Sequence, residues 1–294
     1  MLENLFNGLS LASVLLLAAL GLTFTFGQMG VINMAHGEFI MAGAYVPYVL
    51  QTGLLAGAVG LAFALSLPVA FVIAGILGLV LERLLLHRML DRPLDTLLVT
   101  VGVSLILQQL ARDLFGNSNV QVMAPELLSG NIQALGLTMP RSRLFIMVLT
   151  VVTVVLVQLF LARSAQGRRM RAVTQNRDLA AVSGLRTRRT DAFTFFLGSG
   201  LAGIAGVAVA LIGPIGSASG TAFVVDAFLV VIIGGLGKLR GTIIAALAVG
   251  MLNAFSSYYS SASLGKAVVL VAVIIFLQFK PNGLVSFRTR GLTA

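Results

Sequence analysis

The sequence predicts an all-α polytopic membrane protein, a single transmembrane domain over residues 1–294 with about eight to nine transmembrane helices. Hydrophobic residues make up 58% of the chain and charged residues 10%, whereas soluble domains average roughly 45–50% and about 25%. The apolar residues form runs close to the roughly 20 residues that a membrane helix needs. Most basic residues lie in short gaps between these runs, as in the cytoplasmic loops of membrane proteins. The net charge of +10 therefore does not indicate a nucleic-acid partner.

Nine apolar runs are candidate membrane helices. They lie at 9–26, 31–52, 55–81, 96–112, 143–162, 192–212, 223–236, 241–256 and 265–280. The runs at 223–236 and 241–256 are short for a crossing. They form either two thin spans or one helix broken around Gly234–Gly237, so we expect one or two broken or re-entrant segments.

The basic residues predict how the chain is oriented. Eight arginines lie between Arg163 and Arg189, whereas the gaps at 213–222 and 257–264 carry no charge. Because positive loops face the cytoplasm, we expect the loop 163–191 and the C-terminus inside. The N-terminus and the loop 113–142 are then expected outside.

Three kinds of chemistry have little support in the sequence. The chain has no cysteine, which excludes disulfides and thiolate metal sites, and its two histidines leave little for a metal site. It has no G-x-x-x-x-G-K-[ST] motif and therefore no P-loop for ATP. We expect neither a metal nor a cofactor on this chain.

Polar side chains gather in the segment 27–38, at the boundary of two apolar runs. Gln28, Asn33, His36 and Glu38 lie among three glycines that weaken helix continuity. Ionisable residues at membrane depth are costly and usually face a cavity or a partner. The segment is either a broken helix beside a substrate path or an interfacial turn that caps the next helix; both readings stay open.

Isolated polar residues elsewhere in the apolar runs are weaker candidates. Asp226, Asn253 and Gln108 can each touch a substrate, although a hydrogen bond between helices is the commoner role. Lys266 begins the last run and is expected to extend toward the headgroups.

The basic loop contains the pattern of a short helix. Asn176 or Asp178 can cap its start and Gly184 can end it, with Leu179 and Val182 on one face. Such a loop either holds the chain inside by its charge or docks into a groove of another protein, and the short capped helix favours docking.

Three segments resemble the permeases of the branched-chain amino acid class of ABC importers. They are 30–45 (GVINMAHGEFIMAGAY), 233–242 (IGGLGKLRGT) and a loop that holds Gly167, Arg171, Asn176 and Gly184. The stretch 178–184 (DLAAVSG) is similar to the E-A-A-x-x-x-G coupling motif, with Asp178 and Leu179 departing from its first two positions. Within the class, 26–45 and 261–284 are most similar to the urea permeases.

The resemblance implies a subunit that does no catalysis itself. It implies a complex in the bacterial inner membrane of two permeases, two ATP-binding subunits that hold ATP and magnesium, and a periplasmic substrate-binding protein. The expected function is urea import by alternating access, with a branched-chain amino acid or other amide importer as the alternative. A secondary transporter or channel is the alternative outside the ABC class. The resemblance assigns ATPase coupling to a set of loop residues: Gly167, Arg171, Asn176, Asp178, Ala180 and Gly184.

Overall fold

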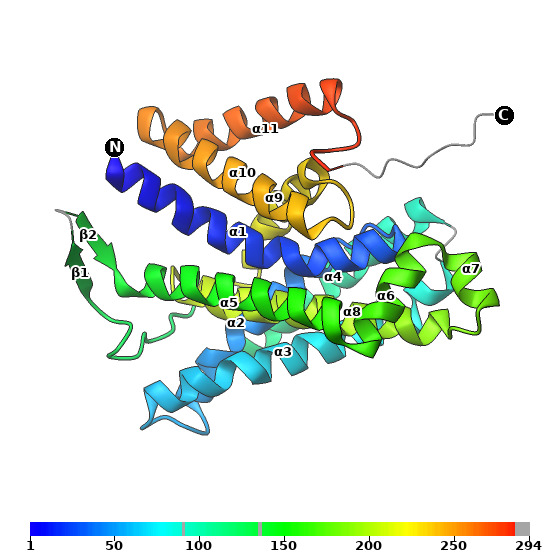
Figure 1. The fold of residues 1–294 in the computed structure, drawn as a ribbon. Helices are drawn as coiled ribbons and strands as arrows, with labels where there is room; N and C mark the ends of the chain where they lie inside the picture. Colours follow the sequence, from blue (N-terminus) through cyan, green and yellow to red (C-terminus); the bar gives the residue numbers. More distant parts are fainter. Residues whose placement is uncertain (90–91, 135–136, 286–294) are drawn as a thin grey trace.

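The computed structural model describes residues 1–89, 92–134 and 137–285, and these are predominantly helical (Figure 1). The helices are α1 (Leu2–Met29), α2 (His36–Thr52), α3 (Val59–Leu84), the 3₁₀ turn η1 (Leu86–Arg88), α4 (Pro93–Phe115), α5 (Arg141–Arg163), α6 (Ala165–Gln175), α7 (Arg177–Val182), α8 (Thr187–Ala210), α9 (Ser219–Gly234), α10 (Leu239–Tyr259) and α11 (Ala262–Phe279). Within the described residues, seven helices are long and apolar enough to cross a membrane: α1, α3, α4, α5, α8, α10 and α11. The predicted all-α membrane fold is confirmed.

Two helices, α2 and α9, are shorter than the seven candidate membrane spans and begin inside the bundle. Helix α1 ends at Met29, Gly30 adopts a left-handed conformation with φ 66°, and residues 31–35 are not helical before α2 begins. The side chain of His36, at the start of α2, meets the carbonyl of Ala18, well inside α1. The break predicted in 27–38 is therefore real and buried.

The second break differs from the one expected near Gly234–Gly237. Residues 235–238 separate two complete helices, α9 and α10, so the alternative of one broken helix is wrong. The non-helical segment that leads into the bundle is 211–218, before α9. Ile215 of this segment pairs with Val120 of the loop 113–142, and the segment then carries the chain inward to the start of α9.

The starts of α2 and α9 meet back to back. A Cβ atom on Gly37 would lie 2.5 Å from the carbonyl oxygen of Gly220, and one on Gly220 would lie 2.0 Å from that of Gly37. Only glycine permits so close an approach of two backbones. The central helices α1 and α8 cross in the same way at Gly21 and Gly198.

Two parts of the chain, which we call the halves, have the same order of elements: a long helix, a non-helical segment, a short helix and two further helices. Helices α1 to α4 form one half and α8 to α11 the other. Helix α8 packs against α2 and α3, and α1 packs correspondingly against α9 and α10. From their meeting point, α2 runs toward Met123 and α9 toward the end of α1. The halves thus run in opposite directions, an arrangement that recurs in transporters.

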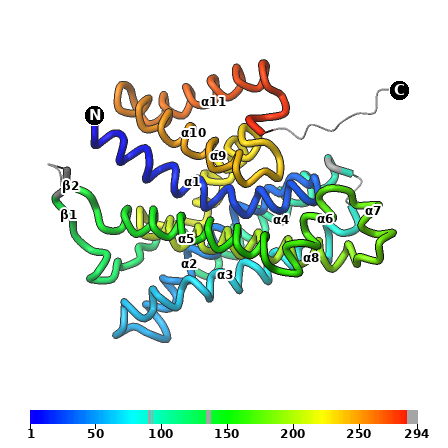
Figure 2. The backbone as a smooth tube through the Cα atoms, viewed as in Figure 1, coloured from blue at the N-terminus to red at the C-terminus, as the bar shows by residue number. Residues whose placement is uncertain are grey.

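The two ends of the bundle differ. Strands β1 (Asn131–Ala134) and β2 (Leu137–Pro140) pair as an antiparallel hairpin, which lies with the N-terminus at one end (Figure 1). Helices α6 and α7 lie at the opposite end, as the tube in Figure 2 also shows. The loops predicted at 113–142 and 163–191 thus hold the hairpin and this helix pair, respectively.

Candidate functional site

The polar residues of the first break are buried where α2 starts. The His36 side chain is fully buried, and its Nε2 lies 3.0 Å from the carbonyl oxygen of Ala18. Asn33 is fully buried as well, and its side-chain amide has no hydrogen-bond partner among the described residues. No side chain forms a capping hydrogen bond at the start of α2, so the Asn33 side chain does not cap this helix.

Glu38 is the centre of a polar cluster that joins three helices. Its Oε1 accepts hydrogen bonds from Ser104 Oγ (2.9 Å) and Gln108 Nε2 (2.8 Å) of α4 and, at 3.4 Å, from Thr221 Oγ1 of α9. The side chain is 1% exposed, and Oε2 has no partner among the described residues. One oxygen of the carboxyl group is thus held in place by three hydrogen bonds, while the other is buried without a partner among the described residues.

A cavity of about 400 Å³ lies beside Glu38, between α2, α3 and α4. Apart from Glu38 and Tyr45, all the side chains that line it are apolar. They are Met41, Ala42, Val46, Val49, Leu50, Leu54, Val69, Ile73, Leu77, Leu107, Leu110, Ala111, Leu114 and Phe115. Asn33 and His36 are not part of this lining. The cavity offers one carboxyl group and a large aliphatic surface, which suits an amphipathic molecule with a polar group that binds a carboxyl group.

The other predicted path residues lie away from this cavity. Asp226 of α9 forms an ion pair with Lys266 of α11 at 3.6 Å, so this lysine has a partner in the protein rather than only the headgroups. Asn253 accepts a hydrogen bond from Ser257 and lines a second cavity of about 460 Å³ between α1 and α10. Gln28 lies near the α6–α7 end, at the last turn of α1.

The predicted coupling residues form a compact helix pair. Asn176 Oδ1 accepts from the backbone amide of Leu179 at 2.9 Å and caps α7, and Gly184 follows the helix with φ 81°. Of the two possible caps, Asn176 is therefore the one used, not Asp178. Arg171 donates to the carbonyl of Leu161 at 2.6 Å, and a Cβ atom on Gly167 would lie 2.6 Å from the Leu161 backbone, so α6 packs closely against α5.

The α7 surface combines one buried and two exposed apolar side chains. Ala180 is buried, whereas Leu179 is 65% exposed and Val182 is 88% exposed. Apolar side chains at this spacing on an exposed helix are typical of a surface that binds another protein.

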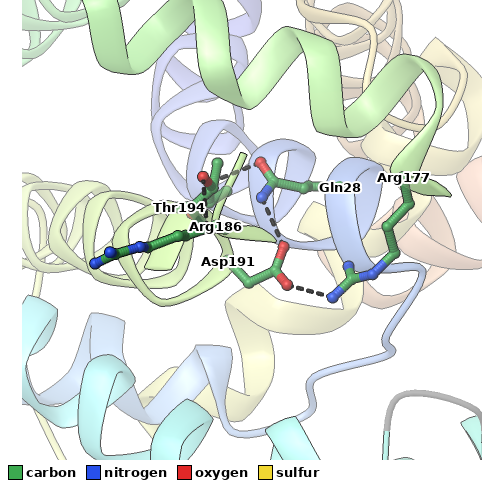
Figure 3. Close-up of polar contacts among 6 residues, drawn as sticks. Gln28, Arg177, Arg186, Asp191 and Thr194 are labelled. Carbon is green, nitrogen blue, oxygen red and sulfur yellow. Dashed lines mark hydrogen bonds and ion pairs between the residues drawn. The ribbon is translucent and has the colours of Figure 1, made fainter. Parts of the chain in front are cut away.

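Sequence reasoning missed a buried carboxylate close to this surface. Asp191, near the start of α8, contacts Gln28 and Arg177, which lie 163 and 14 residues away in the chain (Figure 3). Only the fold brings these partners together. Ser104 was missed as well, although its spacing of four from Gln108 on α4 marks a polar helix face that the sequence could have shown.

A family model described as the branched-chain amino acid transport system permease component matches residues 4–277. The chain belongs to this permease family. The permease is 29% identical over 293 residues to the high-affinity branched-chain amino acid transport system permease protein LivH of Escherichia coli strain K12, covering 96% of this chain and 94% of that protein. It is 28% identical over 298 residues to BraD of Pseudomonas aeruginosa, a permease protein of the same description, covering 96% and 95%. No solved structure matches the chain.

A more distant relative carries a similar description. The permease is 26% identical over 290 residues to a probable branched-chain amino acid transport permease protein LivH of Methanocaldococcus jannaschii, covering 93% of this chain and 89% of that protein. Membership in this family makes the chain a transport subunit rather than an enzyme. It favours the amino acid alternative over the urea permeases.

Proposed function

We propose that this permease carries branched-chain or similarly apolar amino acids across the membrane as a subunit of an ABC importer. The observation that carries the proposal is the aliphatic cavity lined by Glu38, whose Oε2 has no hydrogen-bond partner among the described residues. A leucine-sized side chain gains about 1.5–3 kcal/mol on burial in apolar surroundings. The ammonium group of the same molecule can donate a charge-assisted hydrogen bond to a carboxylate.

Urea fits this cavity less well. It has no apolar part to bury against the aliphatic lining and no positive charge for the Glu38 carboxylate. The relatives named for branched-chain amino acid transport support the same choice. A branched-chain amino acid, the alternative substrate in the sequence analysis, therefore suits the cavity better than urea does.

The energy source and the partners are part of the proposal. ATP and magnesium bind to separate ATP-binding subunits, which dock on α6 and α7 at the cytoplasmic face. The N-terminus and the β hairpin face the periplasm, where a substrate-binding protein delivers the amino acid, and a second permease completes the path. Docking moves α7, and the opposed halves of the fold rock around the meeting point of α2 and α9.

The substrate is tested by uptake into vesicles that contain the complete transporter with its binding protein. We expect ATP-dependent uptake of radiolabelled leucine, with competition by excess valine or isoleucine and none by urea. Uptake of urea without leucine would overturn the substrate assignment. Leucine uptake that persists without the ATP-binding subunits would indicate a secondary transporter or channel instead.

The docking surface is tested by placing charge on α7. In the double variant Leu179→Asp/Val182→Asp, two exposed apolar side chains become carboxylates. We expect the ATP-binding subunits to be lost on purification, because even one such contact is worth about tenfold or more in affinity.

The control for this variant is Leu127→Asp, at a side chain that is 81% exposed in the loop before β1. It changes an exposed leucine in the same way, away from α7, and should leave the complex intact. Retention of the ATP-binding subunits by the double variant would contradict docking on α7.

A further inference from the structure

A buried carboxylate connects three helices near the α6–α7 end. Asp191 of α8 is fully buried. Its Oδ1 accepts a hydrogen bond from Gln28 Nε2 of α1 at 2.8 Å, and its Oδ2 lies 2.5 Å from Arg177 Nη2 of α7. Thr194 of α8 donates to Gln28 Oε1 at 2.6 Å, which fixes the amide from its other side (Figure 3). We refer to Gln28, Arg177, Asp191 and Thr194 as the Asp191 clasp.

The clasp joins the docking helix to the first break. Arg177 is the first residue of α7, and Gln28 lies in the last turn of α1, two residues before the left-handed Gly30. Residues 31–35 then lead directly to the start of α2 and to Glu38. A displacement of α7 is therefore passed through Asp191 to the end of α1 and to the segment that sets the position of α2.

The Asp191 clasp is better suited to fixing the relative positions of α1, α7 and α8 than to stabilising the fold. A buried ion pair is weak support for stability, because well-packed apolar residues in its place are often neutral or stabilising. Such a pair does fix the orientation of the elements that it joins.

We propose that Asp191 is a positioning residue that links the movement of α7 to the break between α1 and α2 and so couples ATP hydrolysis to transport. This inference rests on the proposed docking of ATP-binding subunits at α7. Asp191 touches neither the substrate cavity nor the exposed α7 surface, so its effect is on coupling and not on substrate binding.

The experiment measures substrate transported per ATP hydrolysed by the complete transporter in vesicles. Asp191→Asn keeps the shape of the side chain but removes the charge that faces Arg177, and Arg177→Gln breaks the same contact from the half-exposed side. In each variant we expect ATP hydrolysis to continue while the transport-to-hydrolysis ratio falls by about fivefold or more. The double variant should lose no more than the more affected single variant, because both remove one contact.

Arg189→Gln is the matched control, since Arg189 is an exposed arginine of the same segment outside the clasp. It should keep the wild-type ratio. If Asp191→Asn does not reach the membrane, Arg177→Gln decides the question. A wild-type ratio in assembled Arg177→Gln transporter, or losses that multiply in the double variant, would overturn the clasp alone. Wild-type transport that needs no ATP-binding subunit would instead overturn the proposed function.

Discussion

Gly220→Leu is expected to abolish uptake and to lower the amount of folded permease in the membrane. A Cβ atom at position 220 would lie 2.0 Å from the carbonyl oxygen of Gly37 and 2.4 Å from its carbonyl carbon. Both atoms belong to the backbone, so no side-chain rotation relieves the clash. Inserting methylenes into a packed interior already costs about 1–3 kcal/mol when neighbours can shift, and here the starts of α2 and α9 must separate. The thermal unfolding midpoint in detergent and leucine uptake in vesicles measure the two effects.

Gly102→Leu is the matched control for this substitution. Gly102 is an exposed glycine inside α4, and a Cβ atom built there meets nothing within 4 Å. Leucine is more favourable than glycine in a helix by roughly 1 kcal/mol. Both substitutions therefore stabilise the helix in which they lie. Only the contact between α2 and α9 distinguishes them. Equal stability and uptake in the two variants would show that this contact does not hold the halves together.

The helices and the first break are the parts of the fold that could be predicted from the sequence. Long apolar runs indicate membrane helices, because a helix needs about 20 mainly apolar residues to cross the bilayer. Three glycines among polar residues indicated where α1 ends, and Asn176 and Gly184 marked the limits of α7 through their capping chemistry. Each of these signals is local, so one sequence is enough to reveal it.

The opposed halves and the polar clusters could not be predicted, because their contacts join distant parts of the chain. Nothing near Gly220 in the sequence indicates that it meets Gly37. Asp191 lies at the edge of a basic loop, and nothing near it in the sequence indicates that Gln28 lies beside it. The aliphatic cavity could not be predicted from the motif in 27–38 either, because α2, α3 and α4 build it together.

The second large effect is expected at Glu38. Glu38→Gln preserves an oxygen that can accept from Ser104, Gln108 and Thr221, so the joined ends of α2, α4 and α9 are expected to persist. The substitution removes the negative charge that the proposed function assigns to the ammonium group of the amino acid. Losing a charge-assisted hydrogen bond of about 1.5–3 kcal/mol lowers transport efficiency by at least about tenfold. Leucine uptake at a range of concentrations, corrected for the amount of permease in the membrane, measures the loss.

Asp113→Asn separates the role of the Glu38 charge from a general effect of charge removal. Asp113 is an exposed carboxylate near the end of α4, where it accepts a hydrogen bond from Gln109 at 2.9 Å. It lies outside the Glu38 cavity, so its amide variant should transport as the wild type does. A carboxylate deep in the membrane raises the cost of folding by about 2.5–3.5 kcal/mol or more, so Glu38→Gln is also expected to raise the thermal midpoint or leave it unchanged. Reduced uptake in a permease that is no less stable identifies Glu38 with substrate contact, whereas wild-type uptake would remove the cavity from the transport path.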